Sequence, residues 1–520
     1  MVNIKRKRIG RIVLTAALCV LAVVLTAALT GCGRRNVDVT GVNIAGTPLK
    51  ARHIIVEPEA ETEARRGEQV DDICDFVNRL LTEAGGTPLD REGASDTAAP
   101  ALIFTENSDG YGYDDYVVRL GTGTDNSGSV RFEGGSIWAL KMAWGEFFET
   151  YVQSGRGIVS TPAEDGQSES VLINYTAPDR DAYLSDPSLL PLHWRGEWQP
   201  PAEMLSYEDK VACIERRDTR HVFTTSHRGD WLHYPENSLE AIISVWAMGG
   251  DCVEIDIRVT KDKVPVVLHD TELIRTTDFA DKAGKNGLPE SDKIGDWTLE
   301  ELRQLRLREG AGGPDAAVTP YVIPTLEECL IAARGRFFYI LDKQKAWRYA
   351  ELPDIEEIQP LSKKRYIAPV MEHADNFESV FIAYGTIDET EEGTLDAGEA
   401  LRIQQFIYDT YGRKMYFFLR GWTTLGTASE YAETLERGSL TNSGVIVNGA
   451  FIAADDETNQ TIRTLTRSHP YTFFGAWTID KDGNDVEAVW EMMYRCGLRG
   501  MMSNDMIRLV KFAARAGQYD

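Results

Sequence analysis

From residue 221 onward, short apolar runs alternate with segments whose apolar residues have helical spacing, and this rhythm continues to residue 516. Strands that alternate with helices form parallel sheets, and about eight such units favour a closed (β/α)8 barrel. We therefore predict an α/β fold, a TIM barrel, over residues 221–516. The strand candidates are 221–226, 252–259, 264–269, 337–341, 366–371, 416–419, 444–447, 471–476 and 500–502.

The chain before the barrel has a different pattern. Residues 51–155 combine a strand-like run, two helical stripes and three short strand-like runs separated by Asn, Asp and Gly turns. We predict a small α/β sandwich domain here, of about 100 residues. Residues 156–220 are rich in Pro, Ser, Asp and Trp, which predicts a linker with one or two edge strands. Within the barrel, the long polar segment 276–324 predicts an insertion over the barrel mouth.

The first residues have the pattern of an export signal. Five basic residues precede an uncharged apolar run over 12–29, which ends in Leu29-Thr30-Gly31-Cys32. A cysteine after small residues resembles the bacterial lipobox, so we expect a signal peptide over 1–31, a tether over 32–50, and a lipid on Cys32. That lipid would hold the protein on a membrane of a bacterial cell envelope. The alternative is a single transmembrane anchor, because the run is near the ~20 residues that span a bilayer.

The charge and the cysteines exclude some functions. Lys and Arg number 55 against 81 Asp and Glu, which gives a formal net charge of −26. A nucleic-acid partner is excluded, because no basic face would release counterions from it. Beyond Cys32 the cysteines are odd in number and far apart, without a CxxC pair, so neither a zinc site nor a redox framework is predicted.

Polar residues break the apolar pattern at the ends of predicted strands, where a barrel has its active site. Glu254 and Asp256 are two residues apart in one strand, so both carboxylates point to the same face. Among the apolar residues of that strand they would be costly unless a cation neutralised them. Oxygen ligands without thiols indicate Ca²⁺ or Mg²⁺. The other polar residues at strand ends are His227, Arg228, His269, Asp270, Asp342 and Lys343.

Each of these residues also has a purely structural explanation. A histidine is often a core or capping residue, and Arg228 could pair with a surface carboxylate. Asp342 and Lys343 could form an ordinary ion pair at a strand end, and Asn237 is most simply the N-cap of the following helix. Because the polar residues recur at successive strand ends, the functional interpretation is favoured for the set.

Several short motifs resemble, in order and spacing, the glycerophosphodiester phosphodiesterase family. They are HRG (227–229), PEN (235–237), EIDIRVTKD (254–262), VVLHD (266–270), RTT (275–277) and IPTLEE (323–328), followed by AWTID (476–480) and SND (503–505). The resemblance implies a metal-dependent enzyme that hydrolyses glycerophosphodiesters to glycerol phosphate and an alcohol. The residues that it implies are His227 and His269 as general acid and base, Glu254, Asp256 and Asp342 as cation ligands, Arg228 and Lys343 as phosphate contacts, and Trp477 as a wall of the glycerol pocket.

The sequence departs from the family pattern in places. The predicted fourth strand ends Asp342-Lys343-Gln344-Lys345, where the family commonly has Glu-x-Lys, so Lys345 is an alternative to Lys343 for the phosphate contact. Lys263 stands where the family usually has Gly, and Asn504 interrupts the closing Ser-Asp element. These changes suggest a divergent branch with an altered substrate.

Other functions stay open. The same site could act on a lysophospholipid, a phosphoinositide or a glycerophosphate cell-wall polymer. A lipid-anchored surface scaffold or glycan-binding protein with an inactive barrel is another class, although the two histidines argue against it. Residues 115–149 resemble the accessory α/β domain of alpha-glucuronidase-type and hexosaminidase-type glycosidases, which implies glycan contact and, more weakly, glycosidase activity.

Overall fold

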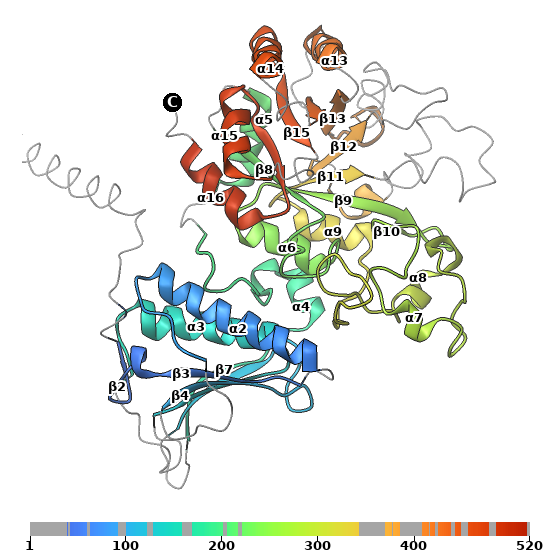
Figure 1. The fold of residues 1–520 in the computed structure, drawn as a ribbon. Helices are drawn as coiled ribbons and strands as arrows, with labels where there is room; N and C mark the ends of the chain where they lie inside the picture. Colours follow the sequence, from blue (N-terminus) through green and yellow to red (C-terminus); the bar gives the residue numbers. More distant parts are fainter. Residues whose placement is uncertain are drawn as a thin grey trace, which may run out of the picture. The chain divides into compact units, whose positions relative to one another are not determined.

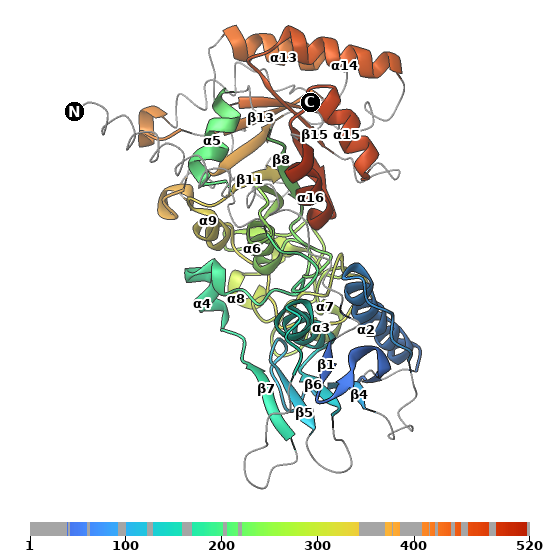
Figure 2. The ribbon, with the colours of Figure 1, turned by 90° about the vertical axis from the view of Figure 1, so that its left-hand side faces the viewer.

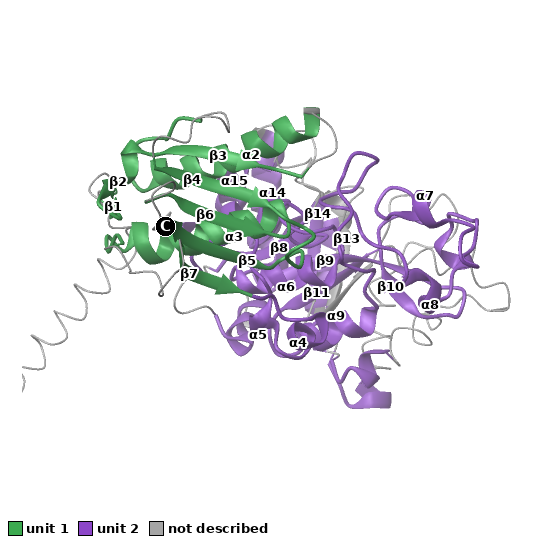
Figure 3. Cartoon of the chain, turned by 90° about the horizontal axis from the view of Figure 1, so that it is seen from below, with its two compact units in different colours: residues 1–175 green, residues 176–520 purple. Residues whose placement is uncertain are grey.

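The computed structural model divides the chain into two compact units, residues 1–175 and residues 176–520 (Figure 3). The structure describes residues 39, 42–59, 63–91, 100–121, 128–158, 169–200, 205–216, 221–342, 370–376, 378–384, 408–414, 416–421, 425–437, 443–448, 456–477 and 485–516.

The first unit is a five-stranded mixed sheet with two helices on one face (Figure 1). Helix α3 (Ile137–Phe147) begins where the side chain of Ser136 accepts a hydrogen bond from the amide of Ala139. Trp144 of α3 packs edge-on against the stacked rings of Phe104 and Phe132, so the core lies between helix and sheet. This arrangement confirms the predicted α/β domain. Its other elements are β1 (Asn43–Ile44), β2 (Thr47–Pro48), η2 (Leu49–Ala51), β3 (His53–Glu57), α2 (Glu63–Glu83), β4 (Ala101–Glu106), β5 (Tyr116–Gly121), β6 (Val130–Gly134), the π-helical η3 (Phe148–Gln153) and β7 (Glu169–Tyr175).

The segment predicted as a linker, 156–220, is largely folded where it is described. Its strand β7 pairs antiparallel with β5 and completes the sheet of the first unit. Its later part belongs to the second unit, where Trp194 donates to the hydroxyl of Ser244 at 2.9 Å and Lys210 lies 3.4 Å from Asp251. The elements of that part are α4 (Arg180–Ser185), η4 (Pro187–Leu189) and α5 (Tyr207–Arg216).

The second unit contains a strongly curled mixed sheet whose parallel strands pair in the order β8-β9-β11-β12-β13-β14-β15-β16. Strand β8 pairs with β9 as well as with β16, so the pairings run around the whole set. In Figures 1 and 2 these strands lie between α13 and α14 on one side and α6 and α9 on the other. The parallel strands are β8 (Phe223–His227), β9 (Cys252–Val259), β11 (Phe338–Asp342), β12 (Val380–Tyr384), β13 (Tyr416–Gly421), β14 (Ser443–Asn448), β15 (Phe473–Trp477) and β16 (Gly500–Ser503). The other described helices of this unit are α6 (Leu239–Ala247), α7 (Phe279–Lys282), η5 (Ile294–Asp296), α8 (Leu299–Leu302), α9 (Leu326–Ala333), α13 (Leu425–Arg437), α14 (Asp456–Ser468), α15 (Glu487–Arg495) and α16 (Met506–Ala516).

One predicted barrel strand was wrong. The run 264–269 forms β10 (Pro265–Val267), which pairs antiparallel with β9 because a tight turn at Lys263, with φ of 68°, joins them. A parallel neighbour would need a crossover of a dozen or more residues. Of the predicted strand 366–371, residues 366–369 lie outside the described residues, and Met371 lies in a helical turn. Strand β12 was not among the predicted strands.

Within the described ranges, no helix combines the length and apolar character needed to cross a bilayer, and the apolar run 12–29 lies outside those ranges. Among the described residues, Cys74, Cys252, Cys329 and Cys496 are buried free thiols, and Cys213 is half-buried.

A buried charged cluster joins the later part of the segment predicted as a linker, 156–220, to the rest of the second unit. His233 lies between Asp230, whose carboxylate is 2.7 Å from Nδ1, and Glu197, which is 3.5 Å from Nε2. Burial alone would lower the pKa of His233, but the two carboxylates outweigh it and raise the pKa to about 10. The histidine is therefore charged at neutral pH and pairs with both carboxylates.

We expect His233→Gln to lower the unfolding free energy by about 3–5 kcal/mol at pH 7, because two buried carboxylates lose their cation. Since the folded pKa lies above the unfolded value of 6.5, this stabilisation is complete below pH 6.5 and is lost as the pH rises through 10. Denaturation midpoints of both proteins between pH 6 and pH 10.5 measure it. A gap between wild type and variant that does not shrink with rising pH would contradict a charged His233.

Candidate active site

Three carboxylates meet where the C-terminal end of β11 lies beside the middle of β9. Glu254 and Asp256 project from β9, and Asp342 ends β11 in register with Asp256. One oxygen of each carboxylate lies within 4.8 Å of the others, and Glu254 and Asp256 are each only 1% exposed. Two buried carboxylates on one strand face need a positive partner. This donor set of oxygens from two neighbouring strands fits a hard divalent cation, as predicted.

Arg228 lies against the same carboxylates. Its backbone has φ of 61°, in the left-handed region, and its amide donates to the backbone oxygen of Glu254 at 3.0 Å. Its Nε is 3.5 Å from Asp256, and its Nη1 donates to Glu236 at 3.1 Å. Burial would lower the pKa of Arg228, but Asp256, Glu236 and Glu254 raise it above its ordinary value. The guanidinium is thus paired with buried carboxylates and not with a surface one.

Asn237 is not the N-cap of helix α6, so this prediction was wrong. Ser238 is the cap and accepts a hydrogen bond from the amide of Ala241. Asn237 has φ of 59°, its Nδ2 donates to Asp256 at 2.9 Å, and its Oδ1 accepts from the amide of Asp256 at 3.2 Å. It therefore holds the orientation of a candidate cation ligand. The signal that could have found it is a buried carboxylate that needs a donor, combined with the PEN motif.

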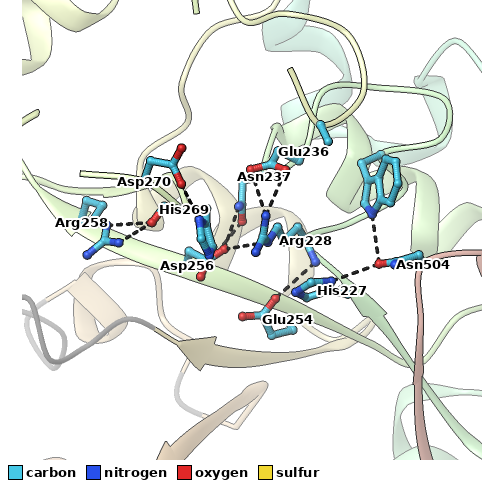
Figure 4. Close-up of polar contacts among 12 residues, drawn as sticks. His227, Arg228, Glu236, Asn237, Glu254, Asp256, Arg258, His269, Asp270 and Asn504 are labelled. Carbon is cyan, nitrogen blue, oxygen red and sulfur yellow. Dashed lines mark hydrogen bonds and ion pairs between the residues drawn. The ribbon is translucent and has the colours of Figure 1, made fainter. Parts of the chain in front are cut away.

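His227 ends strand β8, in register with Glu254 on β9. Its Nδ1 is 3.0 Å from Oδ1 of Asn504, in the loop after β16. The indole Nε1 of Trp231 donates to the same oxygen at 3.2 Å. Figure 4 shows His227 and Asn504 on one side of Arg228, with Asp256 and His269 on the other. In the sequence, Asn504 is a departure from the family pattern, and no motif assigns it to the site.

His269 follows β10 and is held by its neighbour. Its Nδ1 is 2.6 Å from Asp270, which accepts from Nε of Arg275 at 2.6 Å, while Nη2 of Arg275 donates to Glu236 at 2.6 Å. The hydrogen bond with His269 and the charge of Arg275 hold the pKa of Asp270 well below its ordinary value. Because Glu236 also bonds Arg228, contacts connect His269 to Arg228 through Arg275.

Some predicted site residues have no described side chain. Lys343, Lys345 and Cys32 lie outside the described residues. Trp477 is the last residue of β15, in register with Asn448 of β14, and its side chain lies outside what the structure describes. The structure thus brings together His227, Arg228, Glu254, Asp256 and Asp342, and links His269 to them through the Arg275 contacts.

The fold and the site define an α/β protein in which histidines, an arginine and a carboxylate trio gather at the carboxyl ends of parallel strands. The chain belongs to the glycerophosphoryl diester phosphodiesterase family, whose sequence profile matches residues 227–507. The match confirms the resemblance found in the sequence motifs, and it spans both histidines and the carboxylates.

Individual relatives match shorter stretches. A glycerophosphodiester phosphodiesterase from Bacillus altitudinis is 35% identical over 135 residues, 25% of this chain and 48% of the relative. Glycerophosphodiester phosphodiesterase 1 of Rattus norvegicus is 36% identical over 142 residues, 26% of this chain and 35% of the relative. The chain thus spans about half or less of these curated relatives. A solved glycerophosphoryl diester phosphodiesterase from Parabacteroides distasonis has 24% identity and a TM-score of 0.41, covering 61% of this chain and 93% of its own.

Proposed function

We propose that the protein is a metal-dependent phosphodiesterase that hydrolyses glycerophosphodiesters to glycerol phosphate and an alcohol. The observation that carries the proposal is the single cluster in which Arg228 contacts Asp256 of the trio and is linked to His269, while His227 is in register with Glu254. Membership of the family supports it. We further propose that the curled sheet of the second unit is a (β/α)8 barrel.

Charge neutralisation is the first requirement of this reaction, because a phosphodiester anion repels an incoming nucleophile. Glu254, Asp256 and Asp342 would hold Ca²⁺ or Mg²⁺, and the cation, when bound, would supply positive charge to the phosphate oxygens. Arg228 would add a planar cation that matches phosphate, and its pairing with Glu236 fixes the direction of its fork. Lys343 or Lys345 would be a further phosphate contact.

The two histidines would move the protons. One takes a proton from the nucleophile, which is water or a hydroxyl of the substrate next to the phosphate, and the other gives a proton to the departing alkoxide. Asn504 and Asp270 hold Nδ1 of His227 and of His269 respectively, so each ring has a fixed orientation. These two proton transfers require one ring held beside the nucleophile and one held beside the departing oxygen.

A panel of substrates tests the proposal and selects the leaving group. The full chain in detergent, with Ca²⁺ or Mg²⁺, is offered glycerophosphocholine, glycerophosphoinositol, a lysophospholipid and a glycerophosphate polymer. Release of glycerol phosphate from at least one of the small diesters is expected. If the folded protein cleaves the phosphodiester of none of the four substrates with either cation, the barrel is an inactive scaffold of the kind considered above. The glycan contact of the first unit stays a prediction.

We also propose that the protein is exported and held on a bacterial membrane by a lipid on Cys32. Changing Cys32→Ala should remove the site of lipid attachment, so the protein should be released from membranes or keep its signal peptide. Metabolic labelling with a radioactive fatty acid, followed by membrane fractionation, measures both effects, and Cys74→Ala is the control. Unchanged labelling of Cys32→Ala would rule out this attachment site.

A further inference from the structure

The loop after β16 contributes a side chain to the site that the family motifs did not assign. Asn504 lies directly after Ser503, the last residue of β16. The backbone nitrogen of Asn504 donates to Oδ2 of Asp485 at 2.8 Å, and the hydroxyl of Ser503 donates to the same oxygen at 3.0 Å. The backbone at Asn504 is therefore fixed before its side chain reaches the centre.

The contacts of the Asn504 side chain determine which way its amide points. An indole Nε1–H can only donate, so the atom that faces Trp231 at 3.2 Å must be the amide oxygen. The same Oδ1 lies 3.0 Å from Nδ1 of His227. An amide oxygen can only accept, and therefore Nδ1 of His227 must carry the hydrogen. In the neutral ring, the lone pair then belongs to Nε2.

We propose that Asn504 is a positioning residue that fixes His227 in the Nδ1–H tautomer and so presents Nε2 to the substrate. Trp231 supports it, because its indole excludes the flipped amide. The consequence for the reaction rests on the proposed function, since only a proton-transferring His227 needs this tautomer. Asn504, which departs from the family pattern, thus takes part in acid–base catalysis by positioning His227.

The tautomer can be observed without any turnover. The chain has only eight histidines, so ¹⁵N-histidine labelling of the full chain gives a sparse spectrum, and His227→Gln identifies the His227 signals. At a pH where the ring is neutral, the wild type should show a protonated Nδ1 and an unprotonated Nε2. Asn504→Leu, which cannot accept a hydrogen bond, should give a mixture of tautomers or the Nε2–H form. Asn504→Asp restores an acceptor and should keep the Nδ1–H form.

Steady-state kinetics gives a second readout, with the diester that the protein hydrolyses in the substrate panel. Asn504→Leu should lower kcat by ~10–100-fold, the usual effect of removing the partner that orients a functional histidine, with KM little changed. Asn504→Asp should recover most of this loss. The matched control is Asn376→Leu, which removes a buried asparagine that donates to the backbone of Leu330 at 2.7 Å. The control should lower stability and leave the His227 signals and kcat unchanged.

The outcomes separate this inference from the proposed function. An Nε2–H form of His227 in the wild type, or an Nδ1–H form that survives Asn504→Leu, would overturn the positioning role whatever the activity. A tautomer that changes in Asn504→Leu while the wild type hydrolyses no glycerophosphodiester would support the positioning and refute the proposed reaction. A loss of kcat that Asn504→Asp fails to recover, with a normal tautomer, would contradict the role of the acceptor.

Discussion

Replacing either His227 or His269 by alanine should lower the turnover of a glycerophosphodiester by ~10²–10⁴-fold, the usual effect of a positioned proton donor or acceptor. The histidines come from separate segments of the second unit, one at the end of β8 and one after β10. Cation binding should survive in both variants, because neither histidine belongs to the carboxylate trio. Initial rates under saturating substrate, with calorimetry of cation binding, measure both quantities.

The control for this experiment is His373→Ala, which removes a histidine that contacts Glu327 and has 77% of its side chain exposed. Its rate should equal that of the wild type. The variant without both histidines should lose less than the product of the single losses, since groups that act as a unit are not additive. Wild-type rates in both single variants would show that the histidines are structural.

The second large effect concerns the cation. Glu254→Gln should weaken the binding of Ca²⁺ or Mg²⁺ by at least about 100-fold, because removing even the hydrogen-bond partner of a ligand costs 10–100-fold. Glu254 is 1% exposed and shares its strand face with Asp256, so a neutral amide there leaves the trio one charge short. Calorimetric titration of the full chain gives the affinity without relying on activity.

The matched control is Glu327→Gln, which changes a carboxylate that bonds His373. Its affinity for the cation should equal that of the wild type. If Glu254→Gln binds the cation as tightly as the wild type does, the carboxylates of β9 serve another purpose, such as pairing with Arg228 alone.

The sequence predicted the placement of residues that depends only on the local strand period. The period of two in a strand was enough to place Glu254 and Asp256 on one face, and the structure has Asp342 in register with Asp256. The same reasoning failed for 264–269, because an apolar run gives no direction of pairing, and the tight turn at Lys263 makes it antiparallel. Strand β12 was not among the predicted strands, which in this region included only the apolar run 366–371.

The contacts that hold the site together were not predictable from motifs. Asn237 looked like a helix cap, yet it donates to Asp256, because the left-handed turn at this residue leaves the cap to Ser238. Asn504 reaches His227 across 277 residues of sequence, and this contact exists only because β16 pairs with β8. Long-range pairing of this kind leaves no local pattern in the chain.

The release of glycerol phosphate from glycerophosphocholine by the full chain in detergent tests the central claim most directly. The rate is measured with Ca²⁺ or Mg²⁺, after excess chelator, and after the cation is restored. We predict turnover with the cation, its loss on chelation and its return on restoration, because the trio and Arg228 must neutralise the phosphate before the histidines can act. Full turnover in excess chelator, or no release by a folded chain that binds the cation, would contradict the account.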